Sequence, residues 1–273
     1  MNTNHRQAIT EIAYLKKAAL PVTRMKVPVR FAEFYFDLVT PQRAADVVVG
    51  RCLKEAAPGW LAYRSSTRII DLTQAPEALF GMCSKNNRYK IERARRSDGV
   101  EIDFTVAPGA ERVSEFIGYY DAFAVTKGVA PVQRTQFDAI TDSQKLVIAA
   151  ARDSEGEILA ARAYVLGQTR ARLIYSASLF RLQSDSSVRN RIARANRLLH
   201  WEDISRFRDL GVISYDMGGW YTGQGNEALL RINSFKQEFG GKVVDEWDVF
   251  RPRSARGWLY VRARDLVHRD RRR

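Results

Sequence analysis

The chain has 273 residues, with 44 Lys and Arg against 31 Asp and Glu, so its formal net charge at pH 7 is +13. A composition of 45% hydrophobic and 27% charged residues is that of a globular protein with a substantial core, and it excludes a disordered tail protein, a collagen and a disulfide scaffold. The excess of positive charge predicts a polyanionic partner or ligand.

The cysteines and the first residues bear on the cellular compartment. Cys52 and Cys83 set no disulfide framework and are expected to be reduced thiols in the core. Residues 1–22 interrupt their apolar positions with charges, unlike a secretory signal or an anchor. The longest apolar run, 146–151, is far shorter than the roughly 20 residues of a membrane-spanning helix. We therefore expect a soluble, cytoplasmic protein.

The first hundred residues give a weak pattern, which prolines divide into short pieces. The helix that follows Thr73 should begin at an N-cap with Pro and Glu in its first turn and end before Asp98-Gly99. The elements expected here are helices over 6–19 and 41–56, a strand over 60–71, a helix over 75–97 and a strand over 100–106.

From Pro108 onward the periodicity is clearer. Apolar residues spaced three and four apart predict helices, and short apolar runs separated by glycine-containing turns predict strands. The expected order is helices over 109–127 and 133–141, strands over 145–151, 157–166 and 171–179, a helix over 187–210, a strand over 212–217, a helix over 226–239 and a strand over 242–250. This order predicts a mixed α/β layer structure rather than a bundle or a sandwich.

The familiar catalytic and metal-binding motifs are absent from the sequence. Its three histidines and two cysteines have no metal-ligand spacing, and it contains neither a G-x-S-x-G elbow nor a G-x-x-x-x-G-K-[ST] loop. We therefore expect no metal and no cofactor. His200, in the middle of the 187–210 helix, is expected to have a structural or surface role.

The glycine-rich stretch 218–228 admits three interpretations. Gly223, Gly225 and Ala228 fit the dinucleotide motif G-x-G-x-x-A, but they lie too far beyond the preceding strand, and Asp245 lies near the start of the next one rather than at its end. Alternatively, backbone amides at a helix N-terminus bind an anionic or carbonyl oxygen there. The third interpretation is a connection without a ligand.

Three segments concentrate the positive charge. Residues 84–97 hold six Lys and Arg against Glu92 alone, 181–208 hold seven arginines, and the segment from Arg251 holds nine, including 271–273. One basic run is usually a solvated surface. Three separate runs favour phosphate recognition, because the guanidinium fork matches phosphate oxygens.

Several stretches resemble FemABX-type transferases. Residues 85–94 (KNNRYKIERA) resemble the K-x-x-R-Y-x-I-x-x-A helix of that family, and 232–241 (INSFKQEFGG) is similar to its F-K-x-x-F-G-G ending. Between them, 196–202 (NRLLHWE) and 215–219 (YDMGG) resemble the family's long helix and the strand after it. Order and spacing agree over roughly residues 65–250.

This resemblance implies the GNAT acyltransferase fold, a mixed α/β (α+β) fold with a central mixed sheet flanked by helices. It also implies transfer of an aminoacyl group from a charged tRNA to an amine, commonly on a peptidoglycan precursor. The chain is shorter than those relatives, which carry two GNAT-like halves. We therefore expect a reduced N-terminal half over 1–105 with the basic helix 75–97, a catalytic half over 106–250 and an Arg-rich C-terminal segment over 251–273.

The donor can be argued from the segment before the long helix. Acyl-CoA enzymes of the GNAT fold bind pyrophosphate there on [QR]-x-x-G-x-[GA], whereas this chain reads RLQSDSSVRNR over 181–191 and has no glycine between 168 and 210. Side chains at these positions keep phosphate away from backbone amides. The sequence thus favours a tRNA donor over CoA, with an acyl-carrier-protein donor or non-catalytic RNA binding as further alternatives.

Aminolysis of an ester requires alignment, oxyanion stabilisation and the transfer of one proton. Lys236 is the candidate for a fixed positive charge, with Phe235 packed beside it, and Asp216 is the candidate to receive the proton or orient the amine. Their plain alternatives are a surface lysine and a turn aspartate. The predicted substrate-binding residues are Trp220, Tyr221, Gly223 and Asn233, where Trp220 and Tyr221 either line the acceptor pocket or stack on the terminal adenosine of the tRNA. The predicted tRNA contacts are Lys85, Arg88, Tyr89, Arg93, Arg189 and Arg191.

These assignments predict an aminoacyl-tRNA-dependent N-acyltransferase that forms an amide bond with an amine acceptor, either a small molecule or a peptide intermediate. An acyl-CoA-dependent GNAT enzyme and a non-catalytic RNA-binding protein remain the alternatives.

Overall fold

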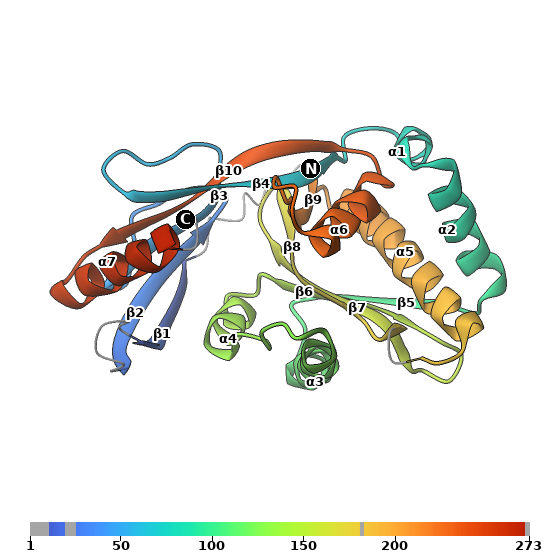
Figure 1. The fold of residues 1–273 in the computed structure, drawn as a ribbon, viewed down its shortest axis with the longest axis horizontal. Coiled ribbons are helices and arrows are strands. Elements are labelled where there is room, and N and C mark those ends of the chain that lie inside the picture. Colours follow the sequence, from blue (N-terminus) through green and yellow to red (C-terminus); the bar gives the residue numbers. More distant parts are fainter. Residues whose placement is uncertain (1–10, 20–25, 181–182, 271–273) are drawn as a thin grey trace, which may run out of the picture. The chain divides into compact units, whose positions relative to one another are not determined.

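The computed structural model describes residues 11–19, 26–180 and 183–270, which form ten strands and seven helices (Figure 1). The strands are β1 (Ile12–Ala19), β2 (Lys26–Tyr35), β3 (Val47–Leu53), β4 (Leu61–Asp71), β5 (Glu101–Val106), β6 (Leu146–Arg152), β7 (Ile158–Leu166), β8 (Arg170–Ser178), β9 (Ser214–Gly219) and β10 (Lys242–Pro252). The helices are α1 (Pro76–Met82), α2 (Lys85–Ser97), α3 (Ala110–Lys127), α4 (Arg134–Asp142), α5 (Ser186–Asp209), α6 (Glu227–Gln237) and α7 (Ala255–Asp270).

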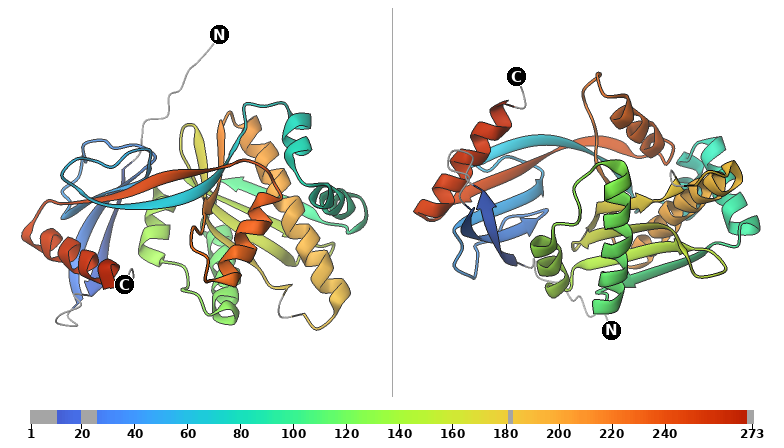
Figure 2. Two further views of the ribbon diagram at one scale, coloured as in Figure 1. Left: turned by 45° about the horizontal axis from the view of Figure 1, so that its top comes forward. Right: turned by 60° about the horizontal axis from the view of Figure 1, so that its bottom comes forward.

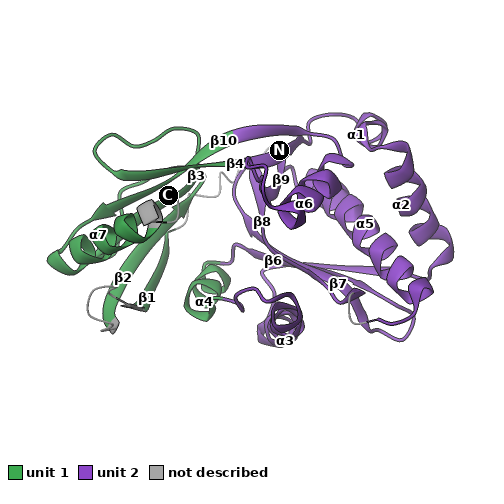
Figure 3. Cartoon of the chain, in the orientation of Figure 1, with its two compact units in different colours: residues 1–66, 133–143, 245–273 green, residues 67–132, 144–244 purple. Residues whose placement is uncertain are grey.

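The chain divides into two compact units (Figure 3). Unit 1 comprises Met1–Ser66, Gln133–Ser143 and Asp245–Arg273, and unit 2 comprises Thr67–Val132 and Gln144–Val244. Strands β4 and β10 contribute residues to both units. Within the described ranges, no helix combines the length and the apolar character that crossing a membrane requires.

Unit 1 is built on the strand order β1-β2-β3-β10. Strands β1 and β2 pair antiparallel, β2 and β3 pair in parallel, and β3 and β10 pair antiparallel. Helix α7 packs on β2 and β3, and helix α4 packs on β1. The core of this unit is aromatic and β-branched, with Phe31, Val47, Tyr63, Phe250 and Val261 in one cluster.

Unit 2 has the strand order β4-β9-β8-β7-β6-β5. Its strands pair antiparallel except for β8 and β9, which pair in parallel over 170–172 and 214–216. Helices α3 and α5 lie on opposite faces of this sheet, and α2 packs against α5 (Figure 2). Because both faces are covered, residues 146–151 of β6 are fully buried, which accounts for their continuous apolar run.

Helix α7 (Ala255–Asp270) was not predicted from the sequence. Between residues 60 and 252, the strands and helices agree with the sequence-based expectations to within a few residues, with one exception. The helix predicted over 75–97 is two helices, α1 and α2, separated at Cys83 and Ser84. The Ser84 side chain accepts the Asn87 amide and so caps the start of α2, which favours the break there.

Before residue 60, the helices predicted over 6–19 and 41–56 are wrong. Where the structure describes these segments they contain β1 and β3, and residues 6–10 lie outside the described part of the chain. The run Val47-Val48-Val49 is buried and β-branched, and such residues favour a sheet. Strand β2, which was not predicted, pairs along the whole of β1.

The compact units group the residues differently from the segments 1–105, 106–250 and 251–273 that the family resemblance implies. The expected segments describe how the chain corresponds to the two GNAT-like halves of the FemABX-type transferases. The compact units do not test this correspondence, so it stays a prediction. Residues 271–273 of the Arg-rich segment lie outside the described part of the chain.

Gly241 offers a test of the close packing of unit 2. Its φ is +76°, and a β-carbon there would collide with the carbonyl oxygen of Ile69. We expect Gly241→Ala to lower the free energy of unfolding by about 1–3 kcal/mol or more, because the new side chain is strained and has no space.

The matched control is Gly118→Ala in α3, where a β-carbon meets nothing within 4 Å. This change should be neutral or stabilise the protein by up to about 1 kcal/mol, because alanine favours helix. Chemical denaturation followed by tryptophan fluorescence measures both variants. Equal effects would contradict the close approach at Gly241.

Candidate functional site

The carboxylate of Asp216, in β9, is completely buried and accepts hydrogen bonds from four groups. The Thr67 hydroxyl, the Gly218 amide at 2.8 Å, and the guanidinium groups of Arg170 and Arg172 all donate to it. Burial alone would raise the pKa of Asp216, but the charges of Arg172 and Arg170, with the Thr67 hydroxyl, hold that pKa below its usual value. Asp216 therefore stays ionised, and this geometry favours an orienting role over acceptance of a proton.

Lys236, on α6, lies against the C-terminal end of β9. Its side chain is buried, with the residue only 9% exposed, and Nζ donates to the carbonyl oxygens of Gly218 at 3.1 Å and Gly219 at 2.6 Å. Burial lowers the pKa of Lys236 to about 8, with the charge of Asp216 opposing the shift and that of Arg172 adding to it. Near neutral pH the side chain thus carries a mostly protonated ammonium whose third hydrogen is available to another acceptor.

The pair Gly218-Gly219 joins these two residues. Gly218 has a φ of +77°, and a β-carbon there would lie 3.1 Å from the carbonyl oxygen of Leu173 in β8. A side chain would therefore be strained and crowded at this position. Asp216 holds the amide of Gly218 and Lys236 holds its carbonyl oxygen, so the structure brings both predicted residues to one short piece of backbone.

The predicted substrate-binding residues lie in and around the loop that joins β9 to α6. Asn233 brackets Tyr221, because its Oδ1 accepts the Tyr221 amide at 3.1 Å and its Nδ2 donates to the Tyr221 carbonyl oxygen at 2.7 Å. Gly223 lies against the Tyr221 ring, where a β-carbon would collide with it. The guanidinium of Arg68 stacks over Trp220 at 5.0 Å and donates to the carbonyl oxygen of Gly240. These contacts give the loop a defined conformation beside Lys236.

Phe235 faces α5. Its ring lies 5.5 Å from that of His200 and 5.4 Å from that of Phe239, and Arg197 stacks on it at 4.9 Å. Arg197 also donates to both oxygens of Glu238. Phe235 therefore anchors α6 to α5, which fixes the direction in which the next residue, Lys236, projects.

Unit 2 contains a chain of buried polar side chains joined by hydrogen bonds, which was not predicted from the sequence. Nδ1 of His200 lies 2.7 Å from the Tyr215 hydroxyl, which lies 2.9 Å from that of Tyr164. Tyr164 and Arg162 both donate to Oδ2 of Asp203. Burial, with the charge of Arg162, lowers the pKa of His200 well below its usual value, so its imidazole is neutral. Burial raises the pKa of Asp203 to about 6, against the attraction of Arg162.

Two signals in the sequence could have revealed this chain. Arg162 stands in the middle of an apolar strand that is buried along most of its length, and a charge at such a position requires a partner. His200 and Asp203 are three residues apart on α5 and therefore share one helix face. Tyr215, a member of this series of hydrogen-bonded side chains, directly precedes Asp216 of the candidate site in β9.

The predicted tRNA contacts are distributed over α2 and the start of α5. Arg88 donates to the carbonyl oxygens of Gly81 and Cys83 and so caps the end of α1. Arg189 donates to the carbonyl oxygens of 183 and 184, and Arg191 to that of Asp98 at 3.0 Å. These three arginines thus already stabilise the fold, and they keep only part of their hydrogen-bonding capacity.

The exposed members of the set are on α2. Lys85, Tyr89 and Arg93 are exposed, and Arg93 reaches the Tyr89 hydroxyl at 3.4 Å. Together they form a cationic surface with one aromatic ring, which suits phosphate and base contacts.

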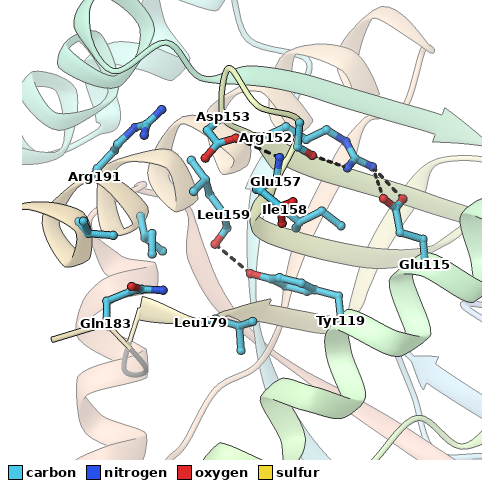
Figure 4. Close-up of a pocket in the computed structure, with 13 residues that line it drawn as sticks. Glu115, Tyr119, Arg152, Asp153, Glu157, Ile158, Leu159, Leu179, Gln183 and Arg191 are labelled. Carbon is cyan, nitrogen blue, oxygen red and sulfur yellow. Dashed lines mark hydrogen bonds and ion pairs between the residues drawn. The ribbon is translucent and has the colours of Figure 1, made fainter. Parts of the chain in front are cut away.

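The N-terminus of α5 is capped by a side chain of the protein itself. Asp185 is the N-cap residue, and its carboxylate accepts the Ser187 amide at 2.7 Å. A cavity of about 620 Å³ lies beside this helix end, with Tyr119, Arg152, Asp153, Glu157 and Arg191 among its lining residues (Figure 4). Arg152 is paired with Glu115 at 2.7 Å in its wall. Residues 181–182 of the predicted donor segment lie outside the described part of the chain.

Among the residues that the structure describes, no group of three or more His, Cys, Asp or Glu side chains is arranged to hold a metal ion.

The pKa of Lys236 can be tested through stability. Its folded pKa, about 8, lies below its ordinary value of 10.5, so between these values the unfolded chain binds more protons than the folded one. Relative to Lys236→Met, the free energy of unfolding of the unchanged protein should therefore rise by a few kcal/mol as the pH rises from 8 to 10.5, and it should stay level below pH 8.

Urea denaturation at a series of pH values measures this difference. Lys242→Met, which changes an exposed lysine, is the control and should give a constant difference over the same range. Parallel curves for both variants would show that Lys236 has an ordinary pKa.

The known proteins that this chain resembles were found by structure. No protein-family model matches the chain, and no curated protein matches its sequence. The crystal structure of FemX matches with a TM-score of 0.59 and 11% identity, over 82% of this chain and 81% of that chain.

Two further structures match with a TM-score of 0.52. One is the C-terminal domain of a candidate lysylphosphatidylglycerol synthetase from Agrobacterium fabrum, at 12% identity over 88% of this chain and 85% of that chain. The other is L-PGS from Bacillus licheniformis, at 15% identity over 87% and 85%. The expected mixed α/β fold class is therefore confirmed, and the fold is like that of FemX.

Proposed function

We propose that this protein is an aminoacyl-tRNA-dependent N-acyltransferase, which transfers the aminoacyl group of a charged tRNA to an amine acceptor and forms an amide bond. The observation that supports the choice of donor is the capped N-terminus of α5, where the Asp185 carboxylate accepts the Ser187 amide. The FemX-like fold and the net charge of +13 also support the proposal.

The closed helix end disfavours CoA as the donor. An anion binds at a helix N-terminus through free backbone amides and through the positive end of the helix dipole. Here the Ser187 amide is already used, and the group that uses it is a carboxylate, which repels a pyrophosphate. The segment also lacks the glycines that allow a phosphate to approach the backbone.

The residues at Gly218-Gly219 supply what aminolysis needs. The neutral amine attacks the ester carbonyl, a C–N bond forms, the C–O bond to the ribose breaks, and the proton on nitrogen passes to the departing ribose oxygen. The ammonium of Lys236 stabilises the negative charge that develops on the carbonyl oxygen. Asp216 stays ionised and holds the backbone to which the Lys236 ammonium donates, so its role is positioning.

The exposed surface of α2 binds the tRNA that carries the aminoacyl group. Lys85 and Arg93 contact phosphates of the tRNA, and the Tyr89 ring stacks on a base. The acceptor is an amine on a small molecule or peptide, held between the loop of Trp220 and Tyr221 and the side chain of Lys236.

Binding of tRNA tests the donor directly. We expect the protein to bind bulk aminoacylated tRNA more tightly than deacylated tRNA, with an affinity that falls steeply as salt rises from 50 to 200 mM, and with no competition from acetyl-CoA. Filter binding with radiolabelled tRNA measures this. Competition by acetyl-CoA, together with equal binding of both tRNAs, would instead favour an acyl-CoA N-acyltransferase.

Two variants separate catalysis from binding. Lys236→Met should reduce transfer of a labelled aminoacyl group to a pool of amines by about 100-fold or more and leave most of the tRNA affinity, while Lys242→Met should do neither. Arg93→Gln should weaken tRNA binding and lower the salt slope by about one. If Lys236→Met and Arg93→Gln only reduce the salt slope alike, the protein is a non-catalytic RNA binder.

A further inference from the structure

Helix α7 is fastened to unit 1 along one of its faces. Gly257 approaches the backbone of Asp46 so closely that a β-carbon would collide with the Asp46 carbonyl oxygen. Tyr260 packs edge-on against Phe31 at 5.1 Å, and Arg264 stacks over Phe250 at 4.3 Å. These contacts fix the rotation of the helix about its axis.

The opposite face of α7 is apolar and open. Leu259 and Leu266, two turns apart, are 48% and 55% exposed, and Trp258 is 50% exposed. Val267, beside Leu266, is exposed as well. At 100° per residue, Trp258, Arg262, Leu266 and Leu259 fall within one arc of the helix surface. Large apolar side chains gathered on one face of a short helix indicate an interaction surface.

Positive charge accompanies this apolar face in the described part of α7. Arg256 and Arg262 are exposed on the same side of α7 as the leucines, and Arg262 stacks on Trp258 at 5.2 Å. The partner of this face must therefore offer both negative charge and an apolar environment.

We propose that α7 docks this protein onto the surface of a bilayer that contains anionic lipid. The helix lies parallel to the surface, with Leu259, Leu266 and Trp258 below the headgroups and the arginines beside the lipid phosphates. Surface-bound helices bear exposed Trp and Leu together with Arg, and the long Arg side chain reaches from the apolar side to the headgroups. A nucleic acid would satisfy the arginines, but its phosphates give no reason for exposed leucines two turns apart.

Vesicle co-sedimentation of the full chain tests the proposal. The protein should bind vesicles of phosphatidylcholine with 30% phosphatidylglycerol and should bind pure phosphatidylcholine vesicles far more weakly, because the arginines need anionic headgroups. The double variant Leu259→Ser/Leu266→Ser should weaken binding to the anionic vesicles by at least about tenfold. Both leucines are half exposed, so the variant should keep the melting temperature of the unchanged protein.

The matched control is Leu15→Ser/Leu210→Ser, which removes two leucines of similar exposure, 55% and 52%, from other elements. It should leave vesicle binding unchanged. Undiminished binding of the α7 variant would overturn the proposal, because the attraction would then be purely electrostatic. Loss of tRNA binding in the α7 variant, without any binding of the unchanged protein to vesicles, would assign this face to RNA instead.

Discussion

The buried negative charge of Asp216 is the constraint on which the candidate site depends. A carboxylate in the interior must be neutralised and fully hydrogen-bonded, and here the donors come from Thr67 in β4 and from Arg170 and Arg172 in β8. These donors hold three neighbouring strands at one point. The same carboxylate also accepts the Gly218 amide, so the position of the backbone to which Lys236 donates follows from the neutralisation of one charge.

Lys236 shows how burial gives an ordinary side chain a specific property. Its ammonium is enclosed and bonded to two carbonyl oxygens, which are neutral, while the nearby carboxylate of Asp216 is already engaged by arginines. The lysine is therefore stabilised less than in a direct ion pair, and its pKa falls to about 8. Both groups are nevertheless charged near neutral pH, because the arginines hold the pKa of Asp216 low and the charge of Asp216 partly offsets the effect of burial on the pKa of Lys236.

The sequence predicted unit 2 well because its elements have clear periods and explicit ends. The strands β6 to β8 are bounded by turns, and α5 is followed by Gly211, which has a positive φ. Residues 11–53 were less predictable, because the run at Val47 is short and apolar and such runs do not distinguish helix from strand. Pairing between β1 and β2 decided the outcome there, and pairing is not visible in one segment alone.

The predicted site residues divide in a similar way. Lys236 and Asp216 meet at one place, but no pattern in the sequence indicated that Arg170 and Arg172 neutralise Asp216 or that Arg88 caps α1. An arginine on a basic helix has the same sequence signature whether it faces solvent or a backbone carbonyl. Only the fold separates these two roles.

The composition of unit 1 has a consequence for the order in which the protein folds. The unit combines the first segment of the chain with α4 from its middle and with most of β10 and α7 from its end. During synthesis, unit 2 has all of its residues once position 244 has left the ribosome, whereas β3 still lacks its neighbour β10. Strands β1 and β2 can pair early, but the other edge of β3 stays open until β10 is made, so a chaperone that shields exposed strand edges has a long opportunity on β3.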